Sequence, residues 1–381
     1  MGKWARAGLQ RGAPRPSADL PDPDTPVTTT SALSGRPSER FFGLFWRASQ
    51  VSYAERRMES LRTATTVTLL LAALLSEVAM SADERPETGA NSVAQALLTD
   101  RLRHHVSVLA GEIGDRNVYR PAALHAAADY IRGEFTAQGH QVTSQRYEVG
   151  GVASENLEGT LRGKTKPDEI VLIGAHYDSV QGSPGANDNA SGVAALLEIS
   201  REIVQFTPER TVRFVAFVNE EPPFFSSAQM GSMVYAKAAR ERGEDIRLMI
   251  SLEMLGFYSD APGSQSYPPL LRFFYPDRAN FIAMVSNLSS RRQLRELVQA
   301  FGAHSDFPVE SLAAFEVVSG LSWSDQLSFW RQGYPAVMVT DTAFYRYPHY
   351  HRASDTLDKL AYAPMARVVE GLRQAIAVLS R

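Results

Sequence analysis

The stretch EIVLIGAHYDSVQGSPGANDNASG, residues 169–192, begins with an unbroken apolar run and ends in polar residues and glycines. An apolar run such as Glu169–His176 is typical of a strand that is buried on both faces of a parallel sheet. A helix is expected next, over Ala190–Phe206. Thr211–Val218, TVRFVAFV, repeats the pattern of a buried strand. These elements predict an α/β protein with parallel strands at its centre.

The same alternation of strands and helices extends from about residue 100 to residue 381. Further helices are expected at 100–114, 121–138, 228–242, 291–301, 325–332 and 364–379, and further strands at 141–149, 156–162, 247–255, 315–318 and 335–340. This alternation predicts a three-layer α/β/α fold around a central, mostly parallel mixed sheet, with the ligand at the carboxyl ends of the strands. The segment 258–306, rich in proline and aromatic residues, is expected to be partly loop and to face the substrate.

The first hundred residues differ from the rest. Residues 1–57 are crowded with Pro, Ser, Thr and Arg, and we interpret them as a disordered or mis-assigned extension. From Met58 a charged start, an apolar core at 64–75 and small residues up to Ala82 form the layout of a signal peptide. The remaining division is a linker at 83–99 and a catalytic domain at 100–381. The hypothesis is a secreted or periplasmic protein, and the alternative is a cytoplasmic tail before a signal anchor.

Composition excludes several classes of protein. The 381 residues carry a formal net charge of −3 and contain no cysteine, and the isoelectric point is about 6.3. A general nucleic-acid binder would be strongly basic. Thiol nucleophiles, disulfides and cysteine-ligated zinc are excluded, so a metal site must use His, Asp and Glu. No stable membrane partner is expected, and the composition does not indicate an oligomeric state.

Histidines and carboxylates follow the predicted strands at the points where each strand ends: His176 with Asp178, then Asp188, Glu220, Glu221, Glu253 and His351. Singly, each has an ordinary explanation, such as a helix N-cap for an aspartate. Together they meet at one edge of the sheet, where neighbouring carboxylates repel one another and a cation relieves the repulsion. Imidazole and carboxylate ligands suit zinc. The pattern therefore predicts two metal ions that activate a water, with one glutamate of the adjacent pair as base.

Four motifs carry a family resemblance: HYDSVQGSPGANDNASG, VNEE, SLEMLG and HRASDT. Across roughly residues 100–381 the chain resembles the zinc exopeptidases that include bacterial leucyl aminopeptidases and glutamate carboxypeptidase II. The resemblance implies two Zn²⁺ ions per chain. It assigns His176 and Glu221 to one zinc, Asp188 as the bridge, and His351 with Glu253 to the second.

The resemblance also implies roles for residues that do not bind metal. Glu220 is the general base and acid, Asp178 orients His176, and Tyr350 stabilises the developing oxyanion. Two positions depart from the family pattern. Glu253 stands where the family usually has Asp, and Gln326 follows Asp325 where many relatives have His.

The function that these observations favour is a zinc-dependent exopeptidase, specifically an aminopeptidase that hydrolyses N-terminal residues from peptide substrates. The alternatives are a glutaminyl-cyclase-like acyltransferase with one zinc, a carboxypeptidase or dipeptidase on the same site, and a binding module without activity. The stretches 257–274 and 220–225 are expected to line the specificity pocket, whose aromatic walls would favour apolar side chains.

Overall fold

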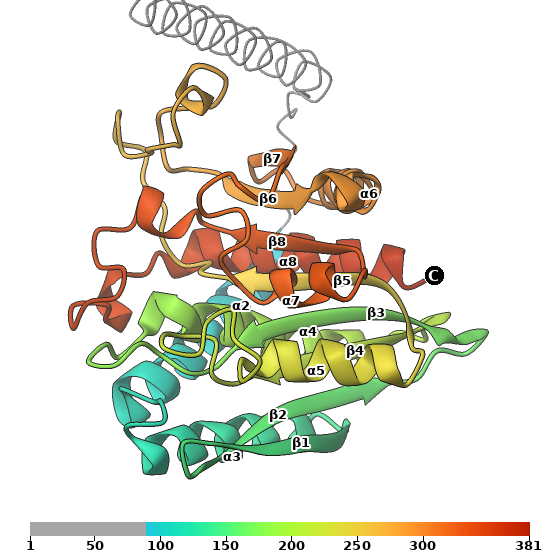
Figure 1. The fold of residues 1–381 in the computed structure, drawn as a ribbon. Coiled ribbons are helices and arrows are strands. Elements are labelled where there is room, and N and C mark those ends of the chain that lie inside the picture. The colour runs from blue at the N-terminus through green and yellow to red at the C-terminus, as the bar shows by residue number, and fades with distance from the viewer. Residues whose placement is uncertain (1–88) are drawn as a thin grey trace, which may run out of the picture. The chain divides into compact units, whose positions relative to one another are not determined.

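The computed structural model describes residues 89–381 (Figure 1). The predicted extension and signal peptide, residues 1–82, lie outside the described residues. Within 89–381, no helix combines the length and the apolar character needed to cross a membrane.

The described part of the chain is built on one mixed sheet of eight strands in the order β1-β2-β4-β3-β5-β8-β6-β7. The strands are β1 Gln141–Val149, β2 Val152–Leu161, β3 Lys166–His176, β4 Arg210–Phe217, β5 Asp245–Glu253, β6 Ile282–Asn287, β7 Val309–Ala314 and β8 Ala336–Thr340. The four central strands β4, β3, β5 and β8 are parallel. Antiparallel pairings add β2 and β1 at one edge and join β6 to β8 at the other.

Helices cover both faces of the sheet, which gives the predicted three layers (Figure 1). The α-helices are α2 Gly89–Val106, α3 Pro121–Ala137, α4 Gly192–Ile203, α5 Gly231–Glu241, α6 Arg291–Gly302, α7 Gln326–Arg331 and α8 Tyr362–Leu379. Helices α2, α4, α6 and α8 pack together on one face, with α3 against α4, and α5 packs with α7 on the other. Two further segments lie near the site: η1 Ser107–Ile113, a π-helical turn, and η2 Ala186–Ser191, whose backbone departs from helical geometry at Asp188 and Asn189.

Three structural expectations from the sequence are wrong. Helix α2 begins at Gly89, so residues 89–99, predicted as linker, are helical. The strand predicted at 315–318 is absent, and the side chains of Phe315 and Val317 are exposed, so no neighbouring strand holds them. Strands β6 and β7 fall in segments where no strand is predicted. Each is only six residues long, and the apolar run of β6, residues 282–285, is too short to stand out in a segment rich in proline and aromatic residues.

The strand that leads into the site depends on a glycine in its centre. A Cβ atom at Gly174 in β3 would come too close to the ring of Phe217, the last residue of β4. That ring is fully buried and packs edge-on against Tyr235 of α5 and at a tilt against Phe329 of α7. The side chain of Phe217 thus occupies the space that a larger residue at position 174 would need.

Gly174→Ala is therefore expected to lower the free energy of unfolding by about 1–3 kcal/mol, through overpacking against a ring that cannot move freely. Chemical denaturation of the purified protein measures this loss. Phe217→Leu alone is expected to be destabilising too, because it leaves a cavity. The double variant should be less destabilised than the sum of the two, and simple additivity would contradict the predicted contact.

Candidate metal centre

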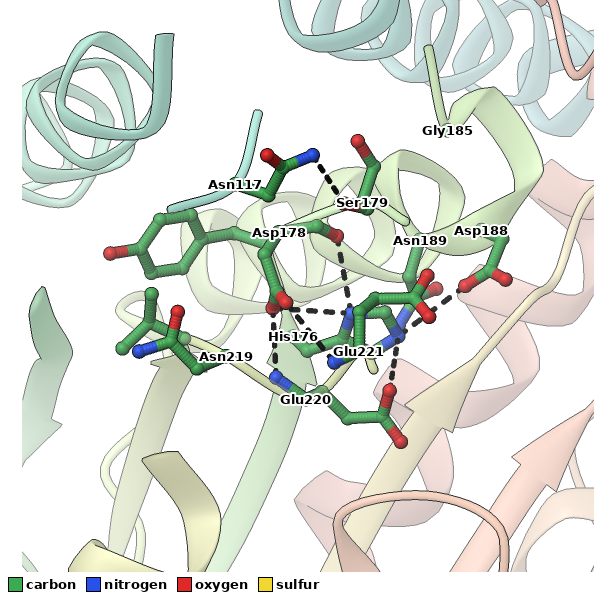
Figure 2. Close-up of polar contacts among 12 residues, drawn as sticks. Asn117, His176, Asp178, Ser179, Gly185, Asp188, Asn189, Asn219, Glu220 and Glu221 are labelled. Carbon is green, nitrogen blue, oxygen red and sulfur yellow. Dashed lines mark hydrogen bonds and ion pairs between the residues drawn. The ribbon is translucent and has the colours of Figure 1, made fainter. Parts of the chain in front are cut away.

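The side chains named from the sequence gather where the central parallel strands end. His176 is the last residue of β3, and Glu253 is the last residue of β5. Glu220 and Glu221 follow β4, and Asp188 lies in η2 just before α4. Figure 2 shows the side chains of His176, Asp188, Glu220 and Glu221 converging on one space. Their side chains are buried, whereas that of His351, from the loop after β8, is 29% exposed.

Asp188 stands between the two histidines. Its Oδ1 lies 3.4 Å from Nε2 of His176, and its Oδ2 lies 3.2 Å from Nε2 of His351. Each oxygen of one carboxylate thus faces a different imidazole. This is the arrangement that a carboxylate needs in order to serve two neighbouring cations at once.

Besides Asp188, each histidine faces one glutamate. Nε2 of His176 lies 3.3 Å from Oε2 of Glu253, and Nε2 of His351 lies 3.2 Å from Oε2 of Glu221. The ligand atoms of His176, Asp188 and Glu253 lie within 4.8 Å of one another, and so do those of Asp188, Glu221 and His351. The structure therefore contains two groups of three candidate ligands that share Asp188.

The pairing of the glutamates is opposite to the expected one. The family resemblance assigns Glu221 to the same zinc as His176, and Glu253 to that of His351. Glu253 instead faces His176, because β5 pairs directly with β3. Glu221 lies four residues beyond the end of β4, and its Oε1 accepts a hydrogen bond from the backbone N–H of Val180 at 3.0 Å, with its other oxygen toward His351.

The buried groups in this space shift one another's pKa values. Burial raises the pKa of Glu221 to about 7 and also raises those of Glu220 and Glu253, which the neighbouring carboxylates reinforce. Burial disfavours the charged imidazoles, but the adjacent carboxylates outweigh it and raise the pKa of His176 and that of His351, the latter to about 10. Imidazole nitrogens and carboxylate oxygens thus face one another across the space that a metal cation would take.

Asp188 is the exception among the carboxylates. Burial opposes its ionisation, but the imidazoles of His176 and His351 outweigh burial and lower its pKa. Nε2 of His176 is buried and makes no hydrogen bond within the described residues. A buried imidazole nitrogen without a partner, facing ionised carboxylate oxygens, fits a bound cation. Nitrogen and carboxylate oxygen donors in groups of three suit zinc.

Asp178 acts mainly on the backbone of the glutamate pair. Its Oδ1 accepts the N–H of Glu220 and its Oδ2 accepts the N–H of Glu221, each at 3.1 Å (Figure 2). Nδ1 of His176 lies 3.2 Å from the main-chain carbonyl oxygen of Asp178 and 3.6 Å from Oδ1. The expected contact to His176 is thus made through the carbonyl, while the carboxylate fixes the two glutamates.

Two further predicted residues adjoin the metal centre. The ring of Tyr350 stacks on the imidazole of His351, with 3.8 Å between centroids, and burial next to the site's carboxylates raises its pKa. Asp325 is fully buried, and neither of its carboxylate oxygens has a hydrogen-bond partner among the described residues. Burial raises its pKa to about 7. The amide of Gln326 donates to the carbonyl of Leu321 at 2.9 Å.

The asparagines on either side of Asp188 explain the motif NDNASG. Nδ2 of Asn189 donates to the carbonyl of Leu252, and its Oδ1 accepts the N–H of Met254, so it brackets Glu253 at the end of β5. Oδ1 of Asn187 accepts the N–H of Gly256. These bonds tie η2 to the end of β5, and they set the distance between Asp188 and Glu253.

Sequence reasoning missed two residues that fix the loop between His176 and Asp188. The buried guanidinium of Arg116 donates to the carbonyls of Tyr177, Pro184 and Gly185. The carboxylate of Asp355 accepts the backbone N–H of Asn187 at 2.8 Å and that of Asp188 at 3.1 Å. Asp355 lies in the quoted motif HRASDT and could have been found there, whereas Arg116 belongs to no recognisable pattern.

An open cavity lies beside Glu253 and Tyr350. The predicted wall 257–274 contributes residues 265–268 and Leu271 to its lining, but the segment 220–225 contributes none. The remaining lining comes from β6, β7, β8 and the loops at 318–323 and 342–345. Strands β6 and β7, which the sequence pattern does not predict, therefore form part of the candidate substrate pocket.

Comparison with known proteins agrees with the geometry. The model of peptidase family M28 matches residues 156–376. An uncharacterised Escherichia coli protein, YfbL, is 40% identical over 282 residues, which are 72% of this chain and 86% of that protein. A probable aminopeptidase of Saccharomyces cerevisiae is 27% identical over 220 residues, which are 54% of this chain and 52% of that protein, so the chain spans about half the length of that relative.

The fold is shared with solved enzymes. The structure of BSAP, a zinc aminopeptidase from Bacillus subtilis, superposes with a TM-score of 0.60 at 16% identity, over 74% of this chain and 95% of that chain. Glutaminyl cyclases are also among the solved proteins with this fold. Fold, donor set and family model together define the class of the protein, a metallopeptidase and thus a hydrolase. Since the family model matches more than half of the chain, the protein belongs to peptidase family M28.

The contrast between two buried aspartates can be tested in the metal-free protein. Asp178→Asn is expected to lower the free energy of unfolding by roughly 1.5–3 kcal/mol at pH 8, because its amide group cannot accept both backbone N–H groups. Asp325→Asn is the matched control and is expected to raise stability, since it removes a buried negative charge that Glu253 and Asp178 repel. Urea denaturation measures both changes.

The control also has a defined pH dependence. The pKa of Asp325 is raised from an ordinary value of 3.8 to about 7 in the folded protein, so its charged form costs stability increasingly from pH 4 to pH 7. The advantage of Asp325→Asn over wild type should therefore be largest at pH 8 and fade toward pH 4. A loss of stability in both variants would show that the two carboxylates are equivalent, contrary to the difference in their hydrogen bonding.

Proposed function

We propose that the protein is a two-zinc aminopeptidase that removes N-terminal residues from peptides. The observation that carries the proposal is the pair of ligand groups that share the two oxygens of Asp188. His176, Glu253 and Asp188 would hold one zinc ion, and His351, Glu221 and Asp188 the other. When bound, the ions lower the pKa of a water and polarise the scissile carbonyl.

Glu220 is a buried carboxylate that belongs to neither ligand group, and we assign it the role of general base and acid. It lies beside both groups, and its Oε2 is 3.9 Å from Nε2 of His176. Burial and the carboxylates of Glu253 and Glu221 raise its pKa, which suits a carboxylate that takes a proton from water near neutral pH. Glu220 accepts the proton of the attacking water and then delivers it to the leaving amine nitrogen.

Tyr350 is the residue that we propose stabilises the charge that develops on the carbonyl oxygen. Its raised pKa keeps the phenol protonated, so it remains a hydrogen-bond donor at neutral pH. The stacking on His351 holds the ring next to a ligand of the second group. A donor fixed in advance near the reacting oxygen lowers the barrier without reorganisation.

The charge of the site supports the choice of the amino terminus. The buried titratable side chains around it are mostly acidic, those of Asp178, Asp188, Glu220, Glu221, Glu253, Asp325 and Asp355. An acidic surrounding of this kind favours a substrate ammonium over a substrate carboxylate. The buried guanidinium of Arg116, which adjoins the site, is committed to main-chain carbonyls and is not available to a terminal carboxylate. A carboxypeptidase is therefore less well supported.

Metal content and turnover, measured on the same samples, test the proposal. The wild type is expected to bind two zinc ions and to hydrolyse aminoacyl p-nitroanilides, with activity that a chelator removes and zinc restores. Glu220→Gln should keep both zinc ions and lose at least about 100-fold in kcat, because only the proton-transferring group is altered. Near-normal turnover of this variant would overturn the role of Glu220. One zinc ion and no hydrolysis would favour the glutaminyl-cyclase alternative.

We also propose that the protein is secreted or periplasmic. The support is the sequence from Met58 to Ala82, with its charged start, apolar core and small-residue exit. The expected result of N-terminal sequencing on exported protein is a start shortly after Ala82. A mature chain that begins at Met1 would contradict a cleaved signal peptide.

A further inference from the structure

The cavity beside the metal centre contains a second carboxylate, and the register of the sheet places it. Glu253 at the end of β5 pairs with Thr340 of β8. Thr340 pairs with Ala283 of β6, and Ala283 pairs with Glu310 of β7. All four residues line the cavity. They therefore form one row across four neighbouring strands, with a candidate metal ligand at one end and Glu310 at the other.

The length of the pocket can be estimated from this row. Neighbouring strands are about 4.8 Å apart, so the backbones of Glu253 and Glu310 are separated by roughly 14 Å. A parallel row on the same face consists of Met338, Val285 and Leu312, which also line the cavity. The floor between the two carboxylates is thus almost wholly apolar and is long enough for an extended side chain.

The face of β7 that carries Glu310 is the cavity face. Val309 and Ala313, which alternate with Glu310 along the strand, pack against the hydrophobic core on the opposite side of the sheet. Because successive side chains of a strand point to opposite faces, Glu310 and Leu312 share the side that faces the pocket. The position of Glu310 is therefore fixed by the strand and not by a loop.

Glu310 has no partner for its charge. Its carboxylate is partly buried and makes no hydrogen bond or ion pair with any described residue, and burial raises its pKa. The hydroxyls of the nearby Tyr267 and Tyr275 donate to the carbonyls of Pro276 and Ser311 instead. Arg346 donates to Gln265 and to the carbonyl of Phe281. A partly buried carboxylate without a counter-charge is costly unless a ligand supplies one.

We propose that Glu310 is a specificity-determining residue that selects substrates whose N-terminal residue has a long aliphatic side chain ending in a cation, namely lysine or arginine. The inference rests on the proposed function. The methylene groups would lie on the apolar floor while the ammonium or guanidinium reaches the carboxylate, as amphipathic side chains do at protein surfaces. The apolar preference expected from the sequence is replaced by a preference for a cationic end.

Other side chains fit this pocket less well. A leucine side chain is too short to reach the far end of the row, and it would leave the charge of Glu310 unpaired. A glutamate side chain would bring a second negative charge into an apolar space. Norleucine has the straight stem of lysine without the ammonium group, so it isolates the contribution of the charge.

The test compares kcat/KM of the zinc-loaded enzyme for the p-nitroanilides of arginine, lysine, norleucine and glutamate. We expect the wild type to prefer arginine and lysine over norleucine by roughly 10- to 100-fold, the strength of a hydrogen bond to a charged group. Glu310→Gln should remove that preference and leave the value for norleucine unchanged. Glu316→Gln, outside the cavity, is the matched control and should behave as wild type.

The inference is overturned if Glu310→Gln lowers kcat/KM equally for all substrates, or if the wild type does not favour the cationic ones. Glu310→Gln is expected to fold normally, because no hydrogen bond within the described residues depends on this carboxylate; its thermal unfolding curve checks this.

Calorimetric binding of free L-arginine and L-norleucine separates this inference from the proposed function. If no substrate is hydrolysed but L-arginine binds more tightly than L-norleucine only when Glu310 is present, the proposed function fails and the pocket assignment stands. If substrates are hydrolysed without any side-chain preference and the two amino acids bind equally, the proposed function stands and the assignment of Glu310 fails. Neither hydrolysis nor a difference in binding would refute both.

Discussion

The mutual repulsion of buried carboxylates is the constraint on which this structure depends. Asp188, Glu220, Glu221 and Glu253 are brought into one space at the ends of parallel strands, where burial alone would keep most of them protonated. The two histidines make Asp188 the exception, since their imidazoles hold it ionised. Positive charge is therefore required where these side chains meet, and it stabilises the ionised form of the carboxylates.

The rest of the domain keeps these groups from moving apart. The carboxylate of Asp178 accepts the backbone N–H groups of Glu220 and Glu221, and these two hydrogen bonds set the positions of both glutamates. Asn189 links η2 to the end of β5. The glycine at position 174 lets Phe217 pack beneath the strand that carries His176. Catalytic geometry in this protein is therefore a property of the backbone connections as much as of the ligands.

Much of this could be predicted from sequence, for identifiable reasons. The central strands are long apolar runs, and β1 has the bounds that its pattern predicts, Gln141–Val149. The residues brought together in the site follow those strands directly. The pairing of Glu221 and Glu253 with the histidines could not be predicted, because it depends on which strands are neighbours and on the turn after β4. The role of Glu310 was hidden for a related reason: β7 is a short edge strand, and only its register with β6 relates it to the metal centre.

The hydrogen bonds of Arg116 and Asp355 to the loop at 184–188 have a consequence for the order in which the site can form. These two residues lie far apart in the sequence, yet both hold this loop. His351, a ligand of the second group, also comes late in the chain. A partly synthesised or truncated polypeptide can present isolated histidines and carboxylates, but it cannot assemble the shared arrangement around Asp188. Assembly of the two ligand groups around Asp188 therefore requires the chain up to His351 to be present and folded.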